Sequence, residues 1–143
     1  MKITEKSHID HGLSPRLMAL IARRYADRQA FFIDTFVTPD DEPAVPSQLH
    51  ADVPESECFY QQRCGRKTWS RMCRRPPTTS SLVTVIGGPS SEAPGECILY
   101  TAYGGPLAPR EPGDPGIETP EQAAESFAFW RTHALSSLGS DAA

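Results

Sequence analysis

The stretches SLVTVI at 81–86 and CILYTAY at 97–103 decide the fold of this chain. Both are rich in β-branched and aromatic residues, which favour strands. Glycine and proline lie between them and directly after the second, as is typical of turns. Alternation along the second stretch places Thr101 and Tyr103 on one face. The two stretches therefore predict neighbouring strands at the centre of a sheet.

Three further strands are expected on the N-terminal side of this pair. The segment AFFIDTFV at 30–37 alternates between two faces, and the more polar segments 58–65 and 68–75 are interpreted as strands joined by a turn near Gly65. A long loop, rich in proline and acidic residues, is expected over 38–57. Because most consecutive strands have short links, we predict an antiparallel meander sheet of four to five strands.

A helix is predicted near each end of the chain. Ser14 is a suitable cap for a helix over 15–27 that carries an apolar stripe of Leu17, Leu20, Ile21 and Tyr25. Near the C-terminus, Thr119 and Gln122 have the spacing of a capping box, with Pro120 in the first turn.

The second helix has its own expected apolar face, formed by Ala123, Phe127, Trp130 and Ala134. With both helices packed on the sheet, the chain is predicted to be a single α+β domain over 1–143, with a frayed tail at about 138–143.

Composition narrows the classes of function. No run of 18 apolar residues exists and the N-terminus is polar, so we expect a cytoplasmic protein without a membrane partner. The sequence contains no P-loop, HExxH or GxSxG motif, and no cofactor is expected. The cysteines form no CxxC pair and are interpreted as free thiols, with a metal site or a redox disulfide as alternatives. They are Cys58, Cys64, Cys73 and Cys97.

A basic run at 61–77 is unusual in a chain whose formal net charge is −4. It contains no acidic residue, and arginine, which dominates it, favours bidentate contact with phosphate. Tyr60 and Trp69 lie in or beside it and could stack on unpaired bases. A solvated strand face is the alternative. The predicted nucleic-acid-binding residues are Arg63, Arg66, Lys67, Trp69, Arg74 and Arg75.

Two histidines precede the first helix, His8 and His11 in SHIDHG. A histidine can transfer a proton near neutral pH, so the pair could act as acid and base. With Asp10 they could instead hold a metal ion, or both could be exposed residues of a polar segment. On the last predicted strand, Thr101 and Tyr103 offer hydroxyl groups that could orient a phosphate.

A leading helix with nearby histidines, a sheet with arginines, and strands LVTVI at 82–86 and LYTAY at 99–103 resemble the barnase–EndoU–colicin–RelE group of small ribonucleases. The resemblance spans about 9–103, and the second helix, the loop at 104–115 and the acidic loop have no counterpart in it. It implies metal-independent cleavage, in which a base activates the ribose 2′-hydroxyl and arginine stabilises the phosphorane, leaving a cyclic phosphate.

The resemblance also implies residue roles. His8 or His11 would be the base or acid, Thr101 and Tyr103 would orient the phosphate, and one of Arg63, Arg66 and Arg71 would hold it. The chain is therefore expected to be a toxin-like endoribonuclease acting on RNA, with an antitoxin or another protein as partner. The acidic loop could screen the site until a ribosome or the substrate displaces it.

Two alternatives to this enzyme stay open. In the first, the chain is a non-catalytic module whose arginine-rich patch docks a nucleic acid or an acidic protein. In the second, it is a metal-assisted enzyme that uses His8, His11 and Asp10.

Overall fold

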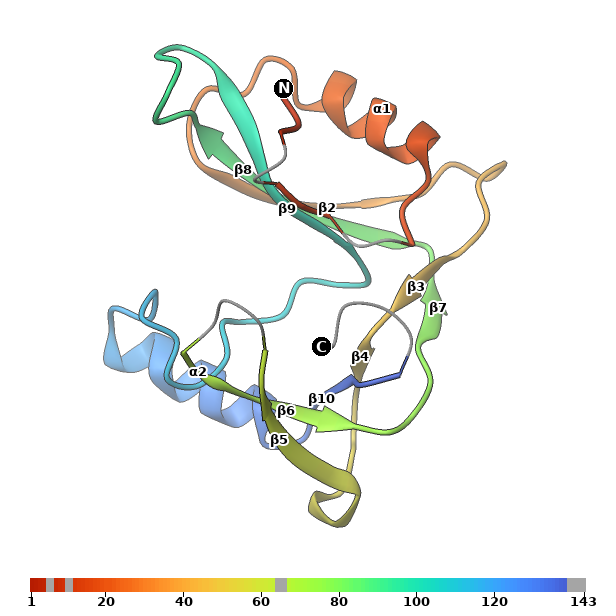
Figure 1. Ribbon diagram of the computed structural model, residues 1–143, viewed down its shortest axis with the longest axis vertical. Coiled ribbons are helices and arrows are strands. Elements are labelled where there is room, and N and C mark those ends of the chain that lie inside the picture. Colours follow the sequence, from red (N-terminus) through yellow and green to blue (C-terminus); the bar gives the residue numbers. More distant parts are fainter. Residues whose placement is uncertain (5–6, 10–11, 64–66, 139–143) are drawn as a thin grey trace. The chain divides into compact units, whose positions relative to one another are not determined.

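The chain folds into two compact units in the computed structural model, which describes residues 1–4, 7–9, 12–63 and 67–138. Unit 1 comprises Met1–Ser47 and Thr79–Pro106. Unit 2 comprises Gln48–Thr78 and Leu107–Ala143. Figure 1 labels both helices and every strand except β1.

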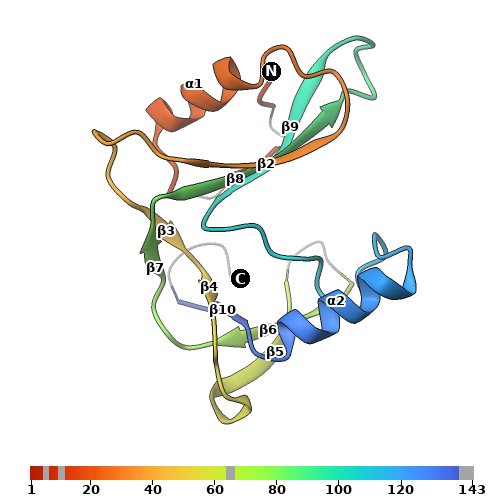
Figure 2. The ribbon, with the colours of Figure 1, turned by 180° about the vertical axis from the view of Figure 1, so that it is seen from behind.

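Unit 1 contains a four-stranded sheet with one helix, α1 (Pro15–Arg24), across one face (Figures 1 and 2). The two inner pairings, β9 with β8 and β8 with β2, are antiparallel, whereas β1 runs parallel to β9. In spatial order, the strands are β1 (His8–Ile9), β9 (Cys97–Gly104), β8 (Leu82–Pro89) and β2 (Phe32–Val37).

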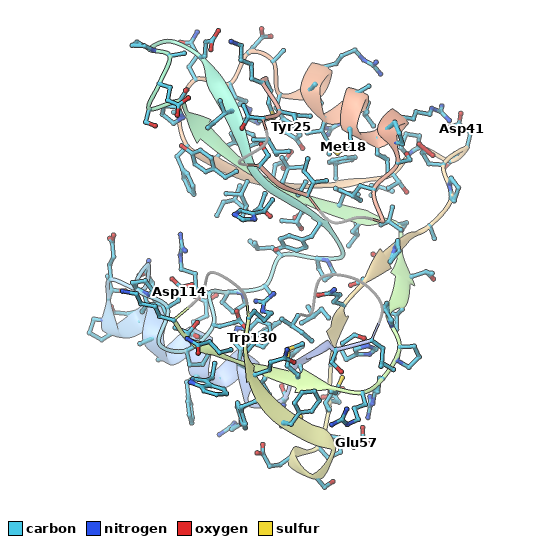
Figure 3. All side chains as sticks on the ribbon, in the orientation of Figure 1. Met18, Tyr25, Asp41, Glu57, Asp114 and Trp130 are labelled. Carbon is cyan, nitrogen blue, oxygen red and sulfur yellow. The ribbon has the colours of Figure 1, made fainter. Side chains whose placement is uncertain are left out.

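The core of unit 1 lies between α1 and the sheet. The Ser14 cap is confirmed, because its hydroxyl accepts a hydrogen bond from the Leu17 amide at 3.1 Å. Leu17, Ile21 and Tyr25 of the predicted stripe are fully buried, and Leu20 is partly buried. The Tyr25 hydroxyl donates to Asp34 Oδ2 at 2.7 Å, which fixes the end of α1 to β2 (Figure 3). The sheet supplies Phe32, Phe36, Val83, Val85, Leu99 and Ala102 to the same core.

The segment 38–57, expected to be a loop, contains several short elements. They are β3 (Val45–Ser47), β4 (Leu49–His50) and the 3-10 helix η1 (Glu55–Glu57). β3 pairs with β7 (Thr78–Ser80) in a separate two-stranded sheet. Elements of two or three residues are too short to show a periodic pattern in the sequence.

Unit 2 contains the second four-stranded sheet and the helix α2 (Pro120–Trp130). The short strand β10 runs parallel to β6, and the other pairings of this sheet are antiparallel. The predicted capping box is confirmed, with Thr119 and Gln122 hydrogen-bonded reciprocally. In spatial order, the strands are β4, β10 (Ala134–Ser136), β6 (Trp69–Cys73) and β5 (Cys58–Gln62).

The predicted apolar face of α2 is confirmed only at Trp130, which is buried. Phe127 is 63% exposed, Ala123 is also exposed, and Ala134 belongs to β10. Ser126 is the other buried side chain of the helix. The indole Nε1 of Trp130 donates to the Pro109 carbonyl at 3.0 Å, and the Ser126 hydroxyl donates to the Arg110 carbonyl. Hydrogen bonds to the preceding loop, rather than an apolar stripe, therefore anchor this helix.

The α+β class is confirmed, but the single antiparallel meander is wrong. The described residues contain two helices and ten strands in three small sheets of mixed direction. After β6 the chain runs into Pro76 and Pro77, which lack the amide donors that a continuing ladder needs. β6 consequently pairs with β5 and β10, and β8 pairs in a different sheet.

Unit 2 has a small apolar core and many buried polar groups. Its apolar cluster consists of Val53, Cys73 and Ala134, with Cys58 packed against it. Buried polar and charged side chains are more numerous: His50, Ser70, Arg71, Glu111, Ser126 and Ser136. Polar contacts therefore contribute much of the packing of unit 2, although the buried His50 Nε2 and Arg71 Nε have no hydrogen-bond partner among the described residues. Neither helix in the described part of the chain is long and apolar enough to cross a bilayer.

Candidate nucleic-acid interface

The antiparallel pair β5–β6 carries an exposed aromatic surface, formed by Tyr60, Gln62 and Trp69. Gln62 lies directly opposite Trp69, and Tyr60 lies opposite Arg71, so all four residues share one face. Trp69 is 60% exposed and Tyr60 is 53% exposed. Tyr60 and Trp69 are diagonal neighbours across the two strands, a spacing of about 7–8 Å that aromatic side chains can bridge. Two large aromatic rings thus stand open to solvent on one side of the ribbon.

Arg63 is tied to the folded unit and its charge is compensated. Its guanidinium donates to the Ser70 hydroxyl at 2.9 Å and to Glu111 Oε2 at 2.7 Å. The Glu111 side chain is almost fully buried, so this ion pair is shielded from solvent. The contact links β6 to the loop that precedes α2.

Arg71 is the most enclosed member of the basic run. It is only 5% exposed and donates to the carbonyls of Val53 and His133 at 3.2 and 3.1 Å. It also forms an ion pair with Glu55 at 3.0 Å. Burial alone would lower the pKa of the Arg71 guanidinium, but the hydrogen bond to Glu55 and nearby negative charge outweigh burial and raise it. Arg71 therefore stays charged and connects β6 to the segments that contain Val53, Glu55 and His133.

The last two arginines of the run lie beyond the end of β6. Arg75 donates to Glu57 at 2.8 Å in a half-exposed pair (Figure 3). Arg74 stacks on the ring of Phe59, with its Cζ 4.7 Å from the centroid. Lys67 is exposed, and the structure records no ion pair for Lys67 or Arg74 within the described residues. Arg66 lies outside the described residues.

Glutamates thus pair with three of the five described basic residues of the run. Glu55 and Glu57 come from η1, in the acidic segment expected to screen the site, and Glu111 comes from the loop before α2. The acidic segment thus contacts the basic run through the ion pairs of Glu55 with Arg71 and of Glu57 with Arg75. Its displacement by a substrate is a separate hypothesis.

The predicted catalytic residues of unit 1 lie on the sheet face opposite α1. His8 of β1 is directly opposite Thr101 of β9, and Tyr103 lies two residues further along the same face. His8 is exposed, whereas Thr101 and Tyr103 are half-buried. His11 lies outside the described residues.

The structure does not join the predicted catalytic set within one unit. His8, Thr101 and Tyr103 belong to unit 1, and Arg71 belongs to unit 2 together with the described nucleic-acid-binding residues. Within unit 1, His8, Thr101 and Tyr103 share a sheet face. Within unit 2, Arg71 shares a face with Tyr60 and Trp69, whereas Arg74 stacks on Phe59 of the opposite face.

Sequence reasoning missed the partners of the arginines and the role of Gln62. Glu55 pairs with Arg71 and Glu57 pairs with Arg75, but no sequence pattern indicates which glutamate meets which arginine. Gln62 is not among the predicted site residues, and the structure places it opposite Trp69.

The residues suited to hold a metal ion are dispersed in the described part of the chain. No group of three or more histidine, cysteine, aspartate or glutamate side chains is gathered there at metal-binding distances. Asp10 and His11, which the metal-assisted alternative requires, lie outside the described residues.

No protein-family model, no curated protein and no solved structure matches this chain. A functional argument for the chain must therefore come from its own residues and their geometry.

Proposed function

We propose that this chain is a binding module for single-stranded RNA, with the aromatic surface of β5–β6 as its contact. The observation that carries the proposal is the exposure of Trp69 and Tyr60 on one face of the same ribbon. Exposing two large aromatic side chains forgoes the free energy of burying them, and stacking on a ligand recovers part of it.

Stacking on unpaired bases is the chemistry that fits this surface. Each base that stacks on an aromatic side chain contributes about 1–3 kcal/mol, largely independently of base identity. The two rings are diagonal neighbours, so each can meet a different base of an extended strand. Double-stranded RNA would hide its base faces and is not expected to bind here.

Phosphate contacts would come from few residues. Lys67 is next to the aromatic surface in sequence and is exposed, whereas Arg74 stacks on Phe59, which belongs to the opposite face of β5–β6. Arg63, Arg71 and Arg75 are already paired with glutamates. For one or two phosphate contacts to a single strand, the logarithm of affinity should fall with the logarithm of salt concentration with a slope of about −0.7 to −1.4.

The test is a titration of a labelled, mixed-sequence single-stranded RNA, followed by fluorescence anisotropy. Trp69→Ala should weaken binding by about 5- to 150-fold, the equivalent of one stacked base. Phe127→Ala is the matched control, because it removes an aromatic ring that is 63% exposed on α2 of the same unit. Equal affinities of the two variants, in folded samples, would refute the proposed surface.

An endoribonuclease is the second candidate function, and the pairing of His8 with Thr101 favours it. An exposed imidazole on one sheet face with two hydroxyl-bearing side chains has the groups that acid–base chemistry requires. The resemblance to the barnase–EndoU–colicin–RelE group suggests attack by the ribose 2′-hydroxyl. Arg71, the predicted phosphate contact, belongs to unit 2 and already donates to Glu55 and two backbone carbonyls.

Cleavage is tested by incubating single-stranded RNA with the protein in EDTA and analysing the product ends. Cyclic phosphate ends that disappear in His8→Ala would support this mechanism. Cyclic ends produced equally well by His8→Ala would remove His8 from it. Intact RNA that nevertheless binds would leave the binding module as the function.

A further inference from the structure

Two cysteines face each other across the β5–β6 pair. Cys58 at the start of β5 is directly opposite Cys73 at the end of β6. Residues directly opposite on antiparallel strands have Cα atoms about 4.5–5.5 Å apart. This separation lies within the range of about 4.4–6.8 Å that disulfides require. Since opposite residues also share a face, the backbone already satisfies the main conditions for a bond.

The two thiols differ in their exposure to solvent, and this difference determines which of them reacts first with an oxidant. Both thiols are free, Cys73 is fully buried, and Cys58 is half-buried at the edge of the same apolar cluster. A small oxidant can therefore reach Cys58 first, and Cys73 is reached through Cys58. Burial raises the pKa of the Cys58 thiol, with Arg71 acting in the opposite direction, so the thiol is not unusually reactive.

We propose that Cys58 and Cys73 form an intramolecular disulfide when the chain meets a small-molecule disulfide. The Cys58 thiolate attacks one sulfur of that reagent, forms a mixed disulfide and expels one thiol. The Cys73 thiolate then attacks the sulfur of Cys58 and expels the second thiol. The two cysteines lose two electrons and two protons together, and the reagent is reduced to two thiols.

The bond would close a ring over 58–73 that contains the whole aromatic surface. It would also hold the end of η1 against β6, because Cys58 directly follows Glu55–Glu57. Glu55 pairs with Arg71 and Glu57 pairs with Arg75. Oxidation would therefore hold η1 close to these two arginines. The cross-link itself depends on the strand register and stands whether or not RNA binds.

The decisive experiment treats the folded chain with oxidised glutathione, blocks the remaining thiols and maps disulfides by mass spectrometry. Trypsin cleaves after Arg63, Arg66 and Arg71, so Cys58, Cys64 and Cys73 fall in different peptides. The expected product is a peptide pair joined through Cys58 and Cys73, in monomeric protein. Glutathione adducts on both residues, or a link from either one to Cys64, would overturn the proposal.

A second measurement asks whether the fold promotes the bond. The variant C64S/C97A keeps only the proposed pair, and its equilibrium with glutathione gives the effective concentration of one thiol at the other. This concentration should be at least about tenfold higher in the native chain than in urea, because the folded register brings the two thiols together. Equal or lower values in the native chain would overturn the proposal. Peptide mapping of the unaltered chain decides the matter if the variant does not fold.

Discussion

The guanidinium of Arg71 donates to the carboxylate of Glu55 at 3.0 Å, although Arg71 is buried and the Glu55 side chain is 72% exposed. The ion pair is consequently solvated on one side and contributes modestly by itself. The two backbone carbonyls that Arg71 also reaches, those of Val53 and His133, are enclosed and depend on it more strongly. Arg71 is thus primarily a structural residue of unit 2.

Truncation of Arg71 should therefore destabilise the protein far more than truncation of its partner. Arg71→Ala leaves two carbonyls without their donor and is expected to lower the free energy of unfolding by about 2–4 kcal/mol. Glu55→Ala removes only the solvated side of the pair and should cost less than about 1 kcal/mol. Urea denaturation followed by tryptophan fluorescence measures both, because Trp69 and Trp130 both lie in unit 2. Equal losses would mean that the ion pair, not the carbonyls, dominates.

The longer elements of the fold could be predicted from the sequence because their signals are local. The caps Ser14 and Thr119 begin the two helices, and alternation gave β2, β8 and β9 to within a few residues. The sheets themselves could not be assembled this way. The pairing of Leu135 with Met72 joins a three-residue strand to one far away in the sequence, and nothing local encodes it.

The residue types of the candidate site could be predicted from the sequence, but the ion pairs that neutralise its arginines could not. The basic run and its aromatic residues are visible in the sequence, and the structure places Tyr60 and Trp69 on one exposed face. The neutralisation of Arg63 by Glu111 is not visible, because 48 positions separate the two residues. Ion pairing between distant segments follows from tertiary structure, so a run of charge in sequence overstates the field at the surface.

Tyr25 should make the stability of unit 1 depend on alkaline pH. Burial, reinforced by the hydrogen bond to Asp34, raises the pKa of Tyr25 to about 12 from an ordinary value of 10.0. The unfolded chain then loses this proton before the folded chain does. The stabilisation is complete below pH 10 and is lost as the pH rises from 10 towards 12, at up to about 1.4 kcal/mol per pH unit.

Denaturation curves from pH 8 to pH 11 check this expectation. Tyr25→Phe should unfold more easily at pH 8, because it lacks the hydrogen bond to Asp34, and its stability should fall less steeply above pH 10. Tyr60→Phe, at an exposed tyrosine, is the matched control and should retain the steeper fall. An identical alkaline slope in the two variants would contradict the role of Tyr25.

Gly104 at the end of β9 should not accept a side chain. A Cβ on Gly104 would overlap the carbonyl oxygen of Pro46 and would lie 2.9 Å from Cγ2 of Val45. Gly104→Ala should therefore cost about 1–3 kcal/mol of stability, as other overpacked sites do. Gly95→Ala is a useful comparison, because its φ of 84° is strained for alanine but the space around it is open. The thermal midpoint should fall further for Gly104→Ala, and the opposite order would show that β3 can move away.

Release of Arg75 from Glu57 should strengthen RNA binding at the proposed surface. Glu57→Gln removes the carboxylate that Arg75 contacts at 2.8 Å and frees one guanidinium for phosphate. The salt slope should then steepen by about 0.7, the value for one added phosphate contact to a single strand. Glu125→Gln on α2 changes the net charge equally at an exposed position and is the control. Anisotropy titrations over a series of salt concentrations separate the two effects. If both variants gain affinity equally and share one slope, overall charge explains the gain and Arg75 does not contact the RNA.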